Sequence, residues 1–167
     1  LPVAVTCSTN ITAVWESYSD VLDCTSLAFD VRKNWEVNTN KGFYAKGDSC
    51  LKLTAIGGND HVTVTVTKPG ELTFNWKAGA TKTVLQLDKT EDGKKESEQK
   101  HVDAIDKWTS VTVKVFVASE GKPAMIEFLP DPGAFDGYLA LDAFTWTPGV
   151  PPPPPERRSF RYAADLV

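Results

Sequence analysis

The chain alternates hydrophobic and polar residues in short runs. In residues 71–77, Leu72, Phe74 and Trp76 fall on one side of an extended backbone, and the polar residues between them fall on the other. This two-residue period indicates strands with one buried face and one solvated face. Clear strands are predicted at residues 51–56, 62–66, 72–76, 84–87, 108–117, 124–129 and 138–146, and weaker ones at 3–7, 27–31 and 35–37.

Turn sequences rich in glycine, proline and aspartate separate these runs, at residues 57–60, 68–70, 91–93, 120–122 and 130–133. No strong helical pattern occurs between them. Residues 89–107 are dense in charges of both signs, which favours a solvated hairpin over a docking loop. The pattern predicts an all-β fold, a two-sheet β-sandwich of jelly-roll type.

Composition suits one domain with short extensions. The chain has 167 residues, of which 41% are hydrophobic and 24% charged. We expect an N-terminal extension with first strands at 1–26, the sandwich at 27–149, a polyproline spacer at 150–156 and a further strand at 157–167. A net charge of −4 argues against nucleic acid, and the chain has no apolar run long enough for membrane insertion.

Four motifs occur in an order typical of one kind of module. They are KPGELTFNWK at 68–77, LQLDKTEDG at 85–93, DKWTSVTVKV at 106–115 and GYLALDAFTWTPG at 137–149. Together they resemble the bacterial secreted jelly-roll modules of the MAM and concanavalin-like kind, which are similar to carbohydrate-binding modules. The resemblance covers roughly residues 27–149. It implies adhesion, sugar binding or a structural role rather than turnover.

Aromatic side chains in a polar stretch are candidates for sugar binding, because flat rings stack on the C–H faces of pyranoses. Trp35, Phe43 and Tyr44 lie in such a stretch, and the amide of Asn38 is placed to bind hydroxyl groups. The alternative is that these rings belong to the core. Trp76, Trp108 and Trp146 are predicted to supply the core of the sandwich.

Catalytic signatures are absent from the sequence. The chain has only two histidines and lacks Gly-x-Ser-x-Gly, His-Glu-x-x-His and Cys-x-x-Cys motifs. We therefore expect a protein that is not an enzyme.

Three aspartates near the last strand, Asp131, Asp136 and Asp142, are candidate ligands for calcium, the one cofactor that the sequence suggests. The alternative is that Asp131 and Asp136 form turns and that Asp142 lies on a strand face.

Several features are typical of an extracellular or cell-surface protein. The sequence begins at Leu1 as a mature secreted chain would, Asn10 lies in an Asn-x-Thr glycosylation sequence, and the cysteines are Cys7, Cys24 and Cys50. Three cysteines allow one disulfide and one remaining thiol, and the spacing leaves the pairing open.

The C-terminal segment alternates again after five prolines. Phe160, Tyr162, Ala164 and Leu166 share one face of a predicted strand. This strand can be part of a longer chain, fold back on its own domain or add to a sheet edge of another copy. The last possibility predicts a structural subunit that assembles head to tail into a homopolymeric filament. The alternative function is a monomeric carbohydrate-binding or adhesion module whose partner is a polysaccharide.

Overall fold

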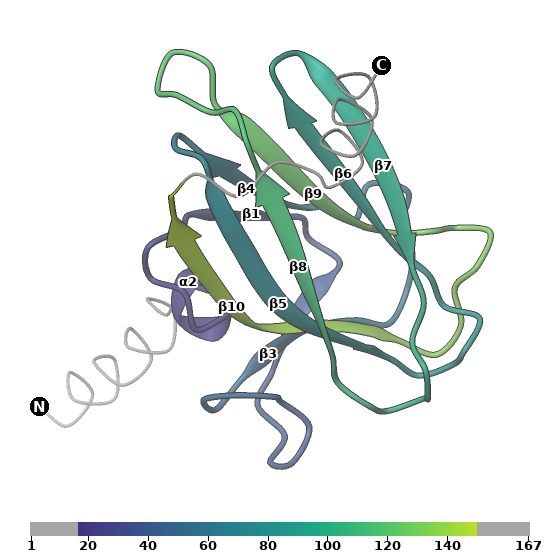
Figure 1. Cartoon of the computed structure of the whole chain (residues 1–167). Helices are drawn as coiled ribbons and strands as arrows, with labels where there is room; N and C mark the ends of the chain where they lie inside the picture. Colours follow the sequence, from purple (N-terminus) through teal and green to yellow (C-terminus); the bar gives the residue numbers. More distant parts are fainter. Residues whose placement is uncertain (1–16, 150–167) are drawn as a thin grey trace, which may run out of the picture.

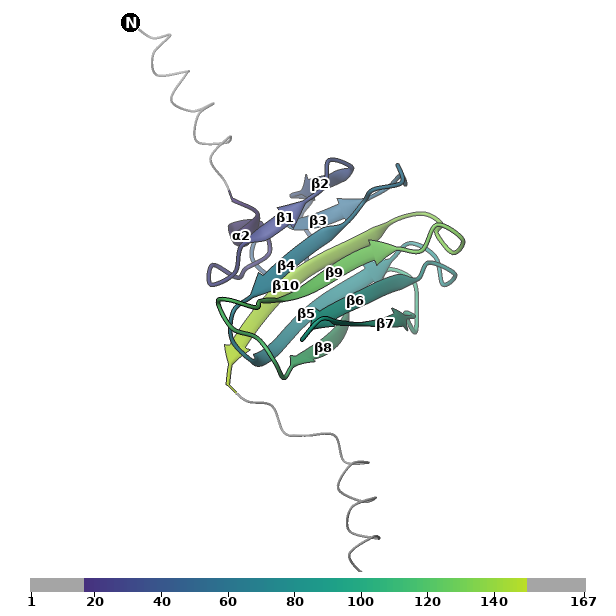
Figure 2. The same ribbon diagram turned by 90° about the horizontal axis from the view of Figure 1, so that it is seen from above.

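Strands form two five-stranded antiparallel sheets that pack face to face (Figures 1 and 2). The structure is a computed structural model that describes residues 17–149. The first sheet has the order β1-β4-β9-β6-β7 and the second the order β2-β3-β10-β5-β8. The strands are β1 (Phe29–Val31), β2 (Trp35–Asn38), β3 (Cys50–Leu53), β4 (Val62–Val66), β5 (Gly70–Ala78), β6 (Leu85–Glu91), β7 (Lys94–Lys100), β8 (Thr109–Val115), β9 (Ala124–Pro130) and β10 (Leu139–Pro148). This confirms the predicted all-β sandwich.

The alternating pattern puts apolar side chains between the sheets. Leu72, Phe74 and Trp76 of β5 are fully buried, as predicted, while the polar residues between them face outward. The centre of the core is aromatic: the ring centroid of Phe74 lies 5.0 Å from that of Phe128 and 5.3 Å from that of Phe144. Edge-to-face and offset contacts of this kind add to the stabilisation from apolar burial.

A bulge interrupts β10 and changes which side chains reach the core. The register with β5 shifts between Asp142 and Thr145, and Ala143 has a positive φ of 54°. Strict alternation after buried Leu141 would turn Phe144 toward solvent, but the extra residue returns Phe144 to the core and leaves Asp142 on the outer face. The bulge therefore lets outward-facing Asp142 and inward-facing Phe144 lie two positions apart on the same strand.

The charged segment after β6 forms the predicted hairpin. Strands β6 and β7 pair from Leu85↔Lys100 to Glu91↔Lys94, and the turn residues Asp92 and Gly93 both have positive φ. A two-residue loop in which both residues have a left-handed backbone conformation matches the twist of the two strands that it joins.

A helical turn that the sequence pattern did not predict precedes β1. Helix α2 (Tyr18–Val21) starts at Ser17, whose hydroxyl accepts from the amide of Asp20. Its four residues are too few to show a helical period. Within residues 17–149, no helix is long and apolar enough to cross a membrane.

Candidate functional site

The loop between β2 and β3, residues 39–49, folds over the outer face of the second sheet. Lys77 Nζ donates a 2.7 Å hydrogen bond to the carbonyl of Phe43, and the amides of Ala45 and Lys46 donate bonds of 2.7 and 3.0 Å to Asp142 Oδ2. Lys77 and Asp142 occupy outward-facing positions of β5 and β10, yet they are only 4% and 0% exposed. The loop thus covers charged groups that alternation alone would leave in solvent.

Three aromatic rings meet where this loop reaches the sheet. The ring centroid of Phe43 lies 5.2 Å from that of Tyr138 and 6.5 Å from that of Trp108, and all three side chains are half-buried. Phe43 comes from the covering loop, Trp108 directly precedes β8 and Tyr138 directly precedes β10. We call Phe43, Trp108 and Tyr138 the aromatic platform.

The backbone around the aromatic platform fixes the rings. The indole N–H of Trp108 donates a 3.1 Å hydrogen bond to the same Phe43 carbonyl that Lys77 uses. The hydroxyl of Tyr138 donates to Asp106, and both burial and this carboxylate raise the Tyr138 pKa. Gly79 is required beside Tyr138, because a methyl group there would lie 2.5 Å from the tyrosine ring.

Two lysines lie under and beside the platform. Ala140 of β10 pairs with Lys52 of β3 on one side and with Lys77 of β5 on the other, so the small alanine separates two long cationic side chains. Lys77 Nζ lies 3.6 Å from the ring centroid of Phe43, and Lys52 Nζ lies 4.6 Å from the same centroid. Lys52 Nζ is also 4.9 Å from the centroid of the Tyr138 ring. These distances are within cation–π range.

Burial alters the acidity of the groups beneath the loop. It lowers the pKa of Lys77, while nearby carboxylates raise it in part. It raises the pKa of the Cys50 thiol to about 12, with a further contribution from Asp142. The thiol therefore stays protonated at neutral pH.

Two carboxylates converge at the other end of the covering loop. The amide of Phe144 donates a 2.9 Å bond to the carbonyl of Leu22, which brings Asp23 close to Asp142. Asp142 Oδ1 and Asp23 Oδ2 are buried and have no hydrogen-bond partner among the described residues. Burial raises the pKa of Asp142 to about 6, and the charge of Asp23 raises it further, while amides of the loop and bulge oppose the shift. Two unpaired oxygens facing so little solvent are a suitable place for a cation.

The predicted calcium trio is not brought together. Asp131 accepts from the Gly133 amide and from Gln99, as a turn residue would, and Asp136 lies in the same loop. Between residues 17 and 149, no group of three or more His, Cys, Asp or Glu side chains is arranged to hold a metal ion. The three-carboxylate hypothesis is therefore wrong for this trio. A cation bound by Asp142 would instead need Asp23 as a second ligand. The spacing of residues in the sequence did not reveal that Asp23 lies next to β10.

The sugar-binding residues that the sequence suggested lie in different environments. Trp35 is only 4% exposed and its indole N–H donates to the Asp60 carbonyl, so it is a core residue and not a stacking platform. The Asn38 side chain is half-buried and accepts from the Asn40 amide within the loop. Tyr44 is half-buried and follows Phe43 of the platform. Trp108, predicted for the core, lies at the platform instead, because it precedes the paired part of β8.

The cysteines and the tail are described only in part. Cys24 and Cys50 are buried free thiols, so no disulfide joins them. Cys7, Asn10, the predicted strand at 3–7, the polyproline spacer and the assembly strand at 157–167 lie outside the described residues.

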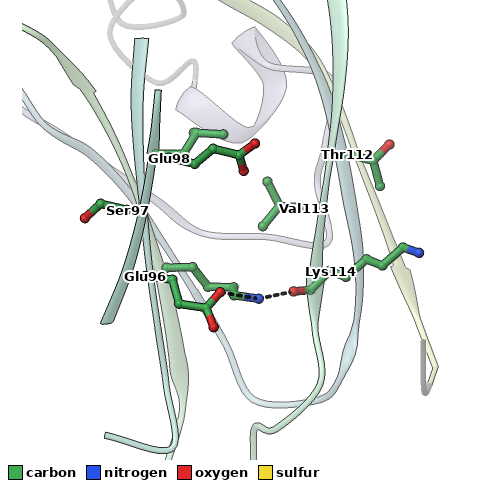
Figure 3. Close-up of a pocket in the computed structure, with 8 residues that line it drawn as sticks. Glu96, Ser97, Glu98, Thr112, Val113 and Lys114 are labelled. Atoms are coloured by element: carbon green, nitrogen blue, oxygen red, sulfur yellow. Dashed lines mark hydrogen bonds and ion pairs between the residues drawn. The ribbon is translucent and has the colours of Figure 1, made fainter. Parts of the chain in front are cut away.

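A hollow lies at the open edge of the sandwich, between β7 and β8. It has a volume of about 310 Å³, with Glu96 and Glu98 of β7 on one wall and Val113 of β8 facing them (Figure 3). Lys89 crosses it, donating to the Lys114 carbonyl at 2.7 Å and lying 3.8 Å from Glu96. None of the residues that line this cleft is aromatic. It therefore lacks the flat apolar surface that stacking on a sugar requires.

Comparison with known proteins agrees with this architecture. No family model matches the chain, and no curated protein matches it. Among solved structures, a family 61 carbohydrate-binding module in complex with β-1,4-galactotriose aligns with a TM-score of 0.53 and 9% identity, over 75% of this chain and 90% of that one. A family 35 carbohydrate-binding module from an environmental isolate aligns with a TM-score of 0.51 and 13% identity, over 77% of this chain and 96% of that one. The chain therefore has the β-sandwich fold of carbohydrate-binding modules.

Proposed function

We propose that this domain is an extracellular module that binds polysaccharide, without cleaving it, through the aromatic platform. The observation that supports this most is the meeting of Phe43, Trp108 and Tyr138, from three separate segments, outside the core. Rings held by fixed hydrogen bonds lose little entropy when a sugar stacks on them. The ammonium of Lys52 beside the rings supplies hydrogen-bond donors for hydroxyl groups of the sugar.

The fold supports the same proposal. One structural neighbour is a complex with a galactose trisaccharide, and both neighbours are binding modules. Head-to-tail assembly, the other function that the sequence suggested, depends on residues 157–167, which lie outside the described structure. We therefore prefer polysaccharide binding to the filament subunit.

Affinity electrophoresis in gels that contain a panel of soluble polysaccharides tests this proposal. We expect at least one polysaccharide to retard the wild-type protein, and Trp108→Ala to abolish most of the retardation because it removes a stacking surface. Ile105→Ala is the matched control, since Ile105 is a nearby apolar residue that is 52% exposed and lies outside the platform. Equal retardation of the wild type and Trp108→Ala, or no retardation by any polysaccharide, would contradict the proposal.

We also propose that Asp23 and Asp142 hold a calcium ion that stabilises the domain. Their unpaired buried oxygens support this, and main-chain carbonyls of the adjoining loop would have to complete the oxygen ligands that calcium prefers. An ion there would neutralise two carboxylates and connect α2, the covering loop and β10. Isothermal titration calorimetry should detect binding to the wild type and to the exposed-site control Asp103→Asn, but not to Asp142→Asn. Absence of binding to the wild type would exclude the ion.

A further inference from the structure

The ammonium group of Lys52 contacts aromatic rings but, unlike that of Lys77, it has no hydrogen-bond acceptor among the described residues. Its side chain is half-buried beside the rings of Phe43 and Tyr138. Within residues 17–149, it makes no ion pair and donates no hydrogen bond to a protein acceptor. A half-buried cation with three free donors favours an anionic ligand.

Lys77 shows the contrasting arrangement. It is 4% exposed, and it donates to the Phe43 carbonyl at 2.7 Å. Lys77 therefore serves to hold the covering loop and has little surface to offer to a ligand. Of the two lysines that contact the platform rings, Lys52 is the one that remains available.

Carboxylates lie near Lys52 without pairing with it: Glu36 of β2 is opposite Lys52 in the strand register, yet no ion pair joins the two side chains. Asp106 accepts from the Tyr138 hydroxyl, and Asp142 Oδ2 accepts from the Ala45 and Lys46 amides beneath the loop. The Lys77 ammonium lies on the other side of Ala140 from Lys52. The carboxylates around Lys52 keep their charge, but none of those described forms an ion pair with its ammonium, which can therefore donate to an acidic group of a ligand.

We infer that the platform prefers sugar chains that carry carboxylate groups, that is, uronate-containing polysaccharides, over neutral chains. One sugar ring stacks on the platform, and a carboxylate of the chain accepts from Lys52 Nζ. This inference deepens the proposed function and rests on it. A charge-assisted hydrogen bond in a partly desolvated site corresponds to a preference of about 10- to 100-fold.

Matched pairs of ligands test the preference. Oligosaccharides of polygalacturonate, alginate and glucuronoxylan are compared with the same oligosaccharides after reduction of their carboxyl groups, which keeps the backbone and removes the charge. We expect the wild type to bind at least one carboxylated form about tenfold or more tightly than its reduced form. Added salt should diminish this difference, because the Debye length shortens to roughly 3 Å at 1 M.

Variants at Lys52 separate this inference from the proposed function. Lys52→Met should bind both members of each pair with the affinity that the wild type has for the reduced form. Lys52→Arg should keep the preference, and Lys114→Met, an exposed position on the same sheet, should behave as the wild type. Equal wild-type affinity for both forms, or a preference that survives in Lys52→Met, would overturn the inference while leaving polysaccharide binding intact. Failure of every ligand to bind would overturn both.

Discussion

The ammonium of Lys77 and the main-chain carbonyl of Phe43 are joined by a 2.7 Å hydrogen bond that attaches the covering loop to the second sheet. The same carbonyl accepts from the indole of Trp108, so one oxygen connects the loop, β5 and the segment before β8. This oxygen holds the platform together, because two of the three rings depend on it for their position.

Removal of the Lys77 ammonium should loosen the loop. Lys77→Met keeps the length of the side chain but cannot donate, and it leaves a partly buried carbonyl with one donor fewer. We expect the free energy of unfolding to fall by about 1–3 kcal/mol. Urea denaturation measures this change, with Lys114→Met as the exposed control for which a change below about 0.5 kcal/mol is expected. Equal stabilities of the two variants would show that the loop is held by other contacts.

The strain at the bulge of β10 is open to a direct test. Ala143 has a φ of 54°, a region that glycine occupies without the steric cost that a β-carbon brings. Ala143→Gly should therefore leave the protein as stable as the wild type or raise its stability by up to about 1 kcal/mol, despite the usual cost of glycine in a strand. Thermal unfolding measures the effect, with Thr112→Gly as the control at a regular strand position. Equal falls in the melting temperature of the two variants would show that Ala143 is not strained.

The same bulge shows where sequence patterns fail. Alternation in residues 71–77 predicted the buried face of β5 correctly, because each residue there advances the strand by one position. In β10, the pattern Leu141-Asp142-Ala143-Phe144 violates alternation, and only the three-dimensional structure shows that an extra residue restores it. The fold class was predictable since most strands obey the simple period.

The site was less predictable for a related reason. Phe43, Trp108 and Tyr138 lie in connecting segments, whose side chains follow no period, and their meeting depends on contacts between residues up to 95 positions apart along the chain. Trp35, by contrast, has a polar neighbourhood in sequence but faces inward, because it pairs with buried Leu53. A polar local sequence is a poor guide to exposure at the end of a strand.

The thiol of Cys50 should be unreactive in the folded protein. It is fully buried, and burial together with the charge of Asp142 raises its pKa to about 12, so the reactive thiolate is scarce at pH 8. Peptide mapping after treatment with iodoacetamide should find Cys50 unmodified in native protein and fully modified in urea. Rapid labelling of the native protein would mean that the covering loop opens readily.

Stability should depend on pH through Asp142 when a chelator removes calcium. Burial raises the folded-state pKa to about 6 from an ordinary value of 3.8, so the folded state binds the proton more tightly than the unfolded state. Protonated Asp142 therefore adds at most roughly 3 kcal/mol to the free energy of unfolding. This stabilisation is fully present below pH 3.8 and is lost as the pH rises through 6.

The variant Asp142→Asn should remove this dependence, because the amide does not titrate and its oxygen still accepts from the loop. Excess calcium should reverse the trend in the wild type, since the ion binds the carboxylate form. Urea denaturation between pH 4 and pH 7 measures both effects. If the stability of the wild type in chelator does not fall over this range relative to that of Asp142→Asn, burial does not raise the pKa of Asp142.

Nuclear magnetic resonance titration of the ¹⁵N-labelled protein with a retained oligosaccharide tests the central proposal most directly. The indole N–H of Trp108 is one of five such groups in the chain, and it belongs to the platform. Binding at the platform predicts that this signal and the amides of Phe43, Lys52 and Tyr138 shift together and saturate with one affinity. Shifts confined to the cleft around Glu96, Glu98 and Val113, with the Trp108 signal unchanged, would contradict it.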